Sequence, residues 1–158
     1  AANLLHAQLV DFMRDGRVDQ EEMPAYSELT RRLGFEYNGM ILHEHYFGNL
    51  RRGGSDAPGS LSAFGQAVEA SFGTFERWKT DFMSVGMLRG IGWAICHLDP
   101  SGGRISNHWV SLHEHGNVTG FVIEVQVRAA AERNIDWQVV EDRLQVGLLS
   151  GGVGHRRV

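Results

Sequence analysis

The sequence predicts an α+β fold, in which helices come first, a small sheet follows and a helix closes the chain. Apolar residues recur at helical spacing through much of residues 3–88. Short apolar runs with alternating side chains appear instead between residues 93 and 127. Because the strands follow the helices as a group, this order excludes a doubly wound parallel sheet.

The first part of the chain, residues 1–52, is expected to form an N-terminal helical hairpin lobe. Three helices are expected in it, over residues 3–14, 24–33 and 39–50. Pro24 is a favourable residue in the first turn of a helix, and Gly34 is a typical helix stop. Asn38 is suited to cap the N-terminus of the helix that follows it.

A stretch rich in glycine, serine and proline, residues 51–60, separates this lobe from a C-terminal α/β lobe over residues 60–146. Helices are expected in this second lobe over residues 61–71, 74–88 and 134–146, and strands over 93–98, 104–112 and 121–127. The first two strands are expected to form a hairpin, and the three together a small three-stranded antiparallel sheet. Residues 147–158, rich in glycine and basic residues, are expected to be a flexible tail.

The composition is that of a globular domain in water. Apolar residues make up 42% of the chain and charged residues 22%, and the net charge of −4 offers no basic surface for nucleic acid. No apolar run is long enough to cross a bilayer. The single cysteine, Cys96, excludes an intrachain disulfide and suits a reducing compartment. We therefore expect a cytoplasmic protein with neither nucleic acid nor a membrane as partner.

Histidine is the residue type that hints at chemistry, because imidazole is a good ligand for transition metals. The triplet His-Glu-His occurs twice, at residues 43–45 and 113–115. On a helix, positions 43 and 45 point about 200° apart, so one metal ion cannot bind both. At the end of a strand, His113 and His115 would share a face, but Gly116 indicates a loop. Taken alone, each of these histidines is better interpreted as a hydrogen-bonded or surface side chain than as a ligand.

Other sites receive less support from the residues. Cys96 lies in an expected strand and not at a helix N-terminus, which is a poor place for an activated thiolate, and it is interpreted as a small core residue. An aromatic pocket near Trp93 and Trp109 would suit a small ligand, although only the number of aromatic residues favours it. The remaining histidines are interpreted as hydrogen-bonded or surface side chains: His6, His97, His108 and His155.

Four segments, in this order, resemble the iron/manganese superoxide dismutase family. They are residues 37–50 (YNGMILHEHYFGNL), 71–79 (SFGTFERWK), 90–94 (GIGWA) and 134–140 (NIDWQVV). In that family the first segment lies on the second long helix, the second opens a helix, the third enters the sheet and the fourth begins the closing helix. The resemblance covers roughly residues 1–122 and 132–145, and it implies a two-lobed α+β fold.

The resemblance also implies roles for individual residues. His43 matches the metal ligand of the second helix, and Trp93 matches the tryptophan that walls the active site. His113 falls where the family places a glutamine or histidine that hydrogen-bonds metal-bound solvent, although His115 can be aligned there instead. Gly39 matches a position that holds glutamine in many iron-type members and glycine in manganese-type members. The solvent partner is therefore expected to come from the sheet, as His113 would.

For the whole protein, the resemblance implies iron or manganese as cofactor, one per chain, and superoxide as substrate. The implied reaction is the disproportionation of superoxide to O2 and H2O2. Family members assemble as dimers or tetramers, so the resemblance also implies a homo-oligomer.

The sequence departs from the family at the other metal ligands. A first-helix histidine and a gateway tyrosine would precede residue 1, and the hallmark DVWEHAY, which supplies an aspartate and a histidine, has no counterpart between residues 122 and 133. Only His43 of four expected ligands is present. Three explanations remain open: the sequence omits segments of an ordinary enzyme, the chain is a degenerate member that acts as a structural or interaction module without metal, or Glu124 and His113 have been recruited into a rebuilt site.

Overall fold

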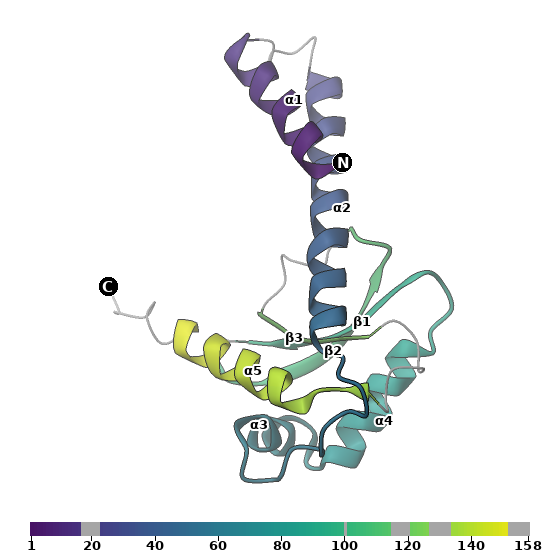
Figure 1. The fold of residues 1–158 in the computed structure, drawn as a ribbon, viewed down its shortest axis with the longest axis vertical. Coiled ribbons are helices and arrows are strands. Elements are labelled where there is room, and N and C mark those ends of the chain that lie inside the picture. The colour runs from purple at the N-terminus through teal and green to yellow at the C-terminus, as the bar shows by residue number, and fades with distance from the viewer. Residues whose placement is uncertain (17–22, 100, 115–120, 127–133, 152–158) are drawn as a thin grey trace.

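A computed structural model describes residues 1–16, 23–99, 101–114, 121–126 and 134–151, with the backbone alone for 23, 121–126 and 146–151 (Figure 1). The elements in chain order are α1 (Ala2–Arg14), α2 (Met23–Gly48), α3 (Ala63–Phe72), α4 (Phe75–Gly86), β1 (Gly92–Leu98), β2 (Ile105–Ser111), β3 (Phe121–Gln126) and α5 (Trp137–Gly151). This order confirms the expected α+β class. Most expected bounds hold to within about two residues, whereas α5 begins at Trp137 and ends at Gly151, not at residues 134 and 146.

The first two helices form a hairpin that projects away from the sheet (Figure 1). Within it, α1 buries Leu5 and Leu9, which face α2 at the helical spacing that the sequence predicts. Two other apolar residues of α1, Leu4 and Met13, are exposed. The second half of α2 stands on the sheet, so this one helix connects the projecting arm to the body of the molecule.

The structure corrects the expected helix end at Gly34. The helices expected over residues 24–33 and 39–50 are one continuous helix, α2, with Gly34 and Asn38 in its interior. A glycine costs a helix only about 1 kcal/mol relative to alanine, which a long helix with a packed face tolerates. Leu42 provides such packing, because it is 1% exposed against the sheet. Asn38 therefore caps no helix.

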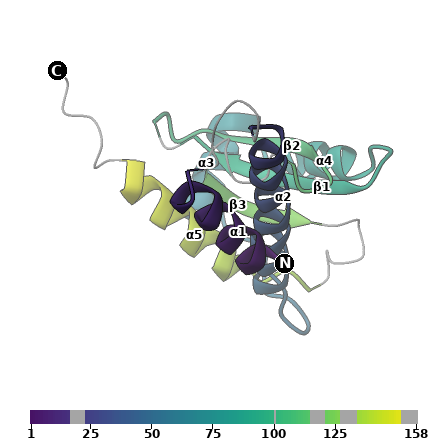
Figure 2. The ribbon, with the colours of Figure 1, turned by 90° about the horizontal axis from the view of Figure 1, so that it is seen from above.

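The sheet has three antiparallel strands in the order β2-β1-β3, as expected in number and direction. Because the central strand β1 is covered on both faces, its alternate residues enter two separate cores. One core lies between the sheet and α3, α4 and α5, and it includes Ala94, Cys96, Leu98, Phe64, Trp78, Val140 and Leu144. A smaller core lies under α2 and consists of Leu42, Trp93, Ile95 and Val110. The burial of Cys96 confirms its interpretation as a core residue. In Figure 2, which is a view from above, α2 lies in front of the strands.

Helix α5 ties the helical parts of the molecule together through two charged side chains. The carboxylate of Glu141 accepts hydrogen bonds from the backbone N–H groups of Ala63 at 2.6 Å and Phe64 at 2.8 Å, which are unpaired groups of the first turn of α3. The guanidinium of Arg143 donates to the side-chain oxygen of Asn49 and, at 3.3 Å, to the carbonyl of His45. The C-terminal end of α2 is thereby fixed beside α5.

Among the described residues, none of the helices has the length and apolar character needed to cross a membrane. His115 and His155 lie outside the described residues, and the side chain of Glu124 does as well.

Candidate functional site

The candidate site lies where α2 crosses the end of β1. Leu42 faces the sheet and is buried, so the next residue, His43, is turned along the side of the helix toward the indole of Trp93. The two rings meet edge-to-face, with centroids 4.8 Å apart and planes 88° apart. Trp93 is 2% exposed, whereas His43 is exposed. His43 therefore stands beside the indole, as the resemblance implies, but at an open surface.

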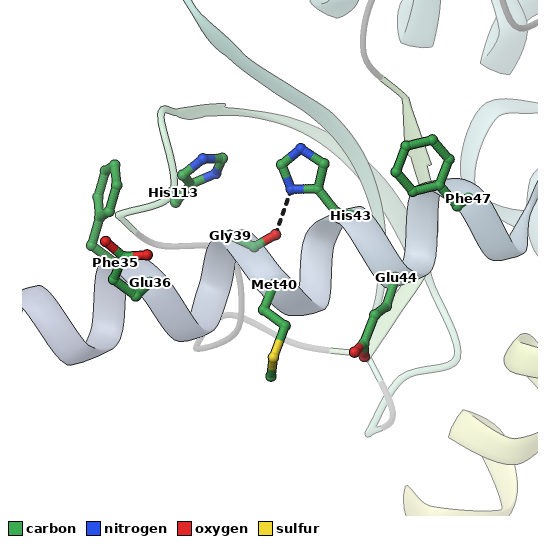
Figure 3. A pocket seen from close by; sticks show the side chains of 8 residues that line it. All are labelled: Phe35, Glu36, Gly39, Met40, His43, Glu44, Phe47 and His113. Atoms are coloured by element: carbon green, nitrogen blue, oxygen red, sulfur yellow. Dashed lines mark hydrogen bonds between the residues drawn. The ribbon is translucent and has the colours of Figure 1, made fainter. Parts of the chain in front are cut away.

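The hydrogen bond of His43 determines which ring nitrogen is free. Its Nδ1 lies 2.6 Å from the carbonyl oxygen of Gly39, one helical turn earlier (Figure 3). Because a carbonyl oxygen can only accept, Nδ1 must carry the proton. The lone pair of the neutral ring is then on Nε2. This is the arrangement typical of metal-ligating histidines, in which a backbone carbonyl orients the ring by binding its other nitrogen.

His113 has the opposite tautomer. The indole Nε1–H of Trp93 donates to its Nδ1 at 2.9 Å, and an indole N–H can only donate. Nδ1 of His113 is therefore an acceptor, and the neutral ring carries its proton on Nε2. Burial and the neighbouring His43 hold the pKa of His113 below its ordinary value, against the opposing effect of Glu36, so the neutral form is favoured.

The ring of His113 occupies the space that a side chain at position 39 would need. A Cβ placed on Gly39 would lie 3.0 Å from Cδ2 and 3.3 Å from Nε2 of His113, which is tighter than ordinary van der Waals contact. The ring comes from the turn after β2, on the sheet side of the helix. The His113 ring and a side chain at position 39 could therefore not occupy this space together.

His43 and His113 line the same cleft, with ring centroids 5.7 Å apart. The cleft has a volume of about 640 Å³ and is lined by Phe35, Glu36, Gly39, Met40, His43, Glu44, Phe47 and His113 (Figure 3). The two lining carboxylates bring negative charge, and none of these eight residues is a lysine or arginine. The cleft is thus a mainly apolar surface with two imidazoles and two carboxylates, and an anion entering it gains no attraction from its walls.

A complete metal site is not present among the described residues. They contain no group of three or more histidine, cysteine, aspartate or glutamate side chains that could hold an ion together. The second histidine of the first triplet, His45, does not line the cleft. This agrees with the helical geometry, which places positions 43 and 45 on different sides of α2.

Two expectations about aromatic and histidine side chains are wrong. Trp109 pairs with Ala94 across the strands, while Trp93 pairs with Val110, so the two tryptophans lie on opposite faces of the sheet and form no common pocket. His97 is neither hydrogen-bonded nor at the surface. It is 3% exposed, and both ring nitrogens are without a hydrogen-bond partner within the described part of the chain.

Comparison with known proteins shows which protein family this chain resembles. The family model of the iron/manganese superoxide dismutase C-terminal domain matches residues 60–127, a segment that contains Trp93 and His113 and leaves out His43. A superoxide dismutase [Fe] from Cupriavidus metallidurans is 42% identical over 80 residues, which are 49% of this chain and 39% of that protein. A superoxide dismutase [Fe] from Aquifex pyrophilus is 30% identical over 138 residues, covering 76% of this chain and 63% of that protein. A superoxide dismutase [Mn/Fe] from Propionibacterium freudenreichii is 28% identical over 100 residues, which are 63% of this chain and 49% of that protein.

The fold, the site and these relatives show that the chain resembles proteins of the superoxide dismutase type. Residues 60–127 match the C-terminal domain of the iron/manganese superoxide dismutase family, and the relatives confirm that more of the chain resembles this family. The chain spans between 39% and 63% of the lengths of the relatives named here.

Sequence reasoning misses one residue that shapes this site. Asn38 is expected from the sequence to cap a helix, yet it is 6% exposed inside α2 and hydrogen-bonds the turn that carries His113. A signal is available, because an amide next to a glycine in an otherwise helical stretch is a poor helix former and needs some other reason to be there.

Proposed function

We propose that this protein acts in the metal-dependent disproportionation of superoxide, with iron or manganese as cofactor. In this reaction two superoxide anions and two protons give one O2 and one H2O2, so one superoxide is oxidised and the other reduced. The proposal is supported by the similarity to superoxide dismutases and by one observation at the site. That observation is the complementary pair of imidazoles, in which His43 presents a lone pair and His113 presents an N–H beside one indole.

The described residues fit the metal only in part. His43 has the tautomer that a ligand requires, but one imidazole does not hold iron or manganese against water. The other ligands of the proposed site would have to come from outside the described residues. A bound metal would supply the redox centre through which an electron from one superoxide reaches the other.

The chain's own residues have separate tasks in the proposed site. His43 offers Nε2 as the ligand atom, held in place by the carbonyl of Gly39. His113 keeps a proton on Nε2, from which it would donate a hydrogen bond to solvent at the metal. Trp93 fixes the tautomer of His113 and covers the inner side of His43, which keeps water from one side of the imidazole.

We also propose that the protein assembles as a homo-oligomer, a dimer or a tetramer, in the cytoplasm. The supporting observation for assembly is the open side of α2, where Tyr37, Met40 and Phe47 are exposed around His43. A second copy over this surface would bury them and enclose the site. We further propose two lobes, residues 1–52 and 60–146. Of the tail expected over residues 147–158, residues 147–151 are the last part of α5.

A second candidate function is that of a degenerate family member, a structural or interaction module without metal. It is favoured by the absence of a three-ligand group from the part of the chain that the structure describes. It predicts an unchanged melting temperature when a chelator is added, whereas a bound ion would stabilise the folded state by mass action.

The test is to purify the protein from its complete gene, to measure iron and manganese per chain and to assay superoxide removal. A metal content near one ion per chain together with superoxide removal would support the dismutase. Metal far below that level, without activity and without a chelator effect on the melting temperature, would support the degenerate member and overturn the first proposal.

A further inference from the structure

The position of His113 depends on a sharp turn at the end of β2. Leu112, the residue before it, has φ +50°, and it is the only non-glycine residue with positive φ among the described residues. A left-handed conformation costs an ordinary residue about 1–2 kcal/mol. The turn therefore needs outside contacts to hold it in this form.

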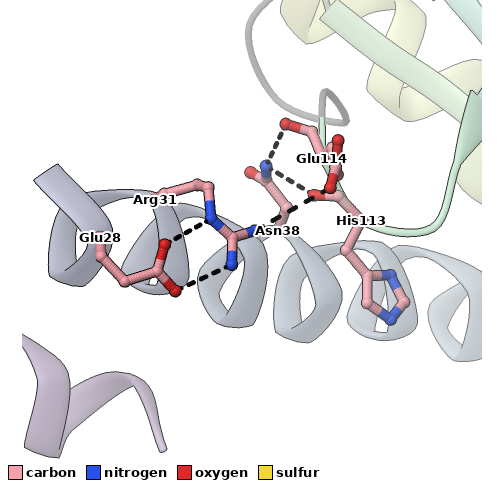
Figure 4. A network of polar contacts seen from close by, with 5 residues as sticks. All are labelled: Glu28, Arg31, Asn38, His113 and Glu114. Carbon is pink, nitrogen blue, oxygen red and sulfur yellow. Dashed lines mark hydrogen bonds and ion pairs between the residues drawn. The ribbon is translucent and has the colours of Figure 1, made fainter.

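Asn38 supplies such a contact from the neighbouring helix. Its side-chain Nδ2 donates to the carbonyl oxygen of His113 at 2.9 Å and lies 3.5 Å from that of Glu114 (Figure 4). Its side chain is almost completely buried, so these bonds compete little with water. The bonds attach the backbone of His113 to α2 at the residue directly before Gly39.

Two hydrogen bonds hold His113, one from Asn38 to its backbone and one from the indole of Trp93 to its Nδ1. Gly39, which has no side chain, leaves room for its ring. Phe35 adds an edge contact, with ring centroids 4.9 Å apart. The exposed pair of Arg31 and Glu114, 4.0 Å apart, adds little because exposed ion pairs are weak.

We infer that Asn38 is a positioning residue. It fixes where His113 lies along the axis of α2 and so brings Nδ1 of His113 to the indole of Trp93. Asn38 itself touches neither the cleft nor the reacting atoms. The consequence for catalysis rests on the proposed function, whereas the positioning of His113 does not. Without the amide, the turn at Leu112 relaxes and the bond between Trp93 and His113 weakens.

The experiment measures hydrogen exchange of the indole N–H groups by NMR in the full chain, with Trp93→Phe used to assign the Trp93 signal. Trp78 is an internal reference, because its indole N–H donates to Asn107 at 3.1 Å on the other side of the sheet. In Asn38→Leu, which keeps the branching at Cγ but has no donor, Trp93 is expected to exchange about tenfold faster relative to Trp78. Asn38→Gln, which keeps the amide, is expected to recover part of this protection.

One control separates positioning from a general loss of stability. Leu9→Ala removes a buried side chain of the arm far from the turn, and it is expected to leave the ratio of the two exchange rates unchanged. If Asn38→Leu does not fold, Asn38→Ser, which is too short to reach both carbonyls, takes its place. Equal acceleration of Trp93 and Trp78, or no acceleration of Trp93, would overturn the inference. Because the readout is independent of metal and turnover, an inactive protein would overturn the proposed function and leave this result standing.

Discussion

The indole N–H of Trp93 donates to Nδ1 of His113 across 2.9 Å, and this bond fixes the tautomer of the histidine. His43, on the other side, is fixed in the opposite tautomer by the carbonyl of Gly39 at 2.6 Å. Two imidazoles in one cleft thus present different groups, a lone pair and an N–H. This difference allows one ring to donate a lone pair and the other to donate a hydrogen bond, and it depends on the surroundings of each ring.

Two glycines of α2 offer a matched pair of substitutions. A Cβ added at Gly34 would meet nothing within 4 Å, so Gly34→Ala is expected to raise the free energy of unfolding by about 0.5–1 kcal/mol, the ordinary helix gain. Gly39→Ala should lose this gain, because its Cβ would lie 3.0 Å from the ring of His113. Urea denaturation measures both values. An equal gain in the two variants would show that His113 does not occupy the space beside position 39.

The burial of His97 leads us to expect that the folded protein loses stability in acid. Its burial, helped by the neighbouring His108, lowers the pKa from 6.5 to about 4. The unfolded chain therefore binds a proton at this site more readily than the folded chain, so stability falls as pH falls from about 6.5 to about 4. The full effect corresponds to at most about 3 kcal/mol.

The matching variants are His97→Leu, which removes the titrating ring from the core, and His6→Leu on the exposed side of α1. Unfolding free energies measured by urea titration between pH 4 and pH 7 should vary less with pH in His97→Leu than in the wild type. His6→Leu should follow the wild-type curve. A wild-type slope that persists in His97→Leu would assign the acid sensitivity to other groups.

The hydrogen bonds of Arg143 are expected to stabilise the contact between α2 and α5. Arg143→Met keeps the apolar stem and loses the donors to Asn49 and to the carbonyl of His45, so the free energy of unfolding should fall by about 1–3 kcal/mol. Arg52→Met, at an exposed position, should change it by less than about 0.5 kcal/mol. Thermal and urea unfolding check both variants. Equal, small changes would mean that water replaces the Arg143 contacts without loss.

The architecture could be predicted from the sequence because its signals are local. Apolar spacing indicates α3 and α4. The structure adds that Ser62 and Thr74 cap these two helices, because their side chains accept backbone hydrogen bonds from the first turn. The continuity of α2 through Gly34 could not be predicted in this way. It depends on packing of Leu42 and Asn38 against the sheet, which a local propensity does not contain.

The site could be predicted only as far as the family resemblance reaches. The resemblance selects His43, Trp93 and His113, and these three side chains do lie together. The tautomers, the open surface around His43 and the strained turn at Leu112 depend on contacts between distant segments, in one case 75 residues apart, which spacing alone does not reveal. The expectation for Trp109 is wrong for a related reason, because the pairing register decides which face of the sheet it occupies.

The central claim is that His43 is a metal ligand. The deciding measurement is the iron and manganese content per chain of three proteins produced from the complete gene: the wild type, His43→Ala and His45→Ala. His45 is the matched control, because it lies on the same helix and does not line the cleft.

If His43 binds the metal, the wild type and His45→Ala retain it, and metal affinity in His43→Ala falls by more than about a hundredfold. Metal retained in His43→Ala, or lost to the same degree in both variants, would contradict this role.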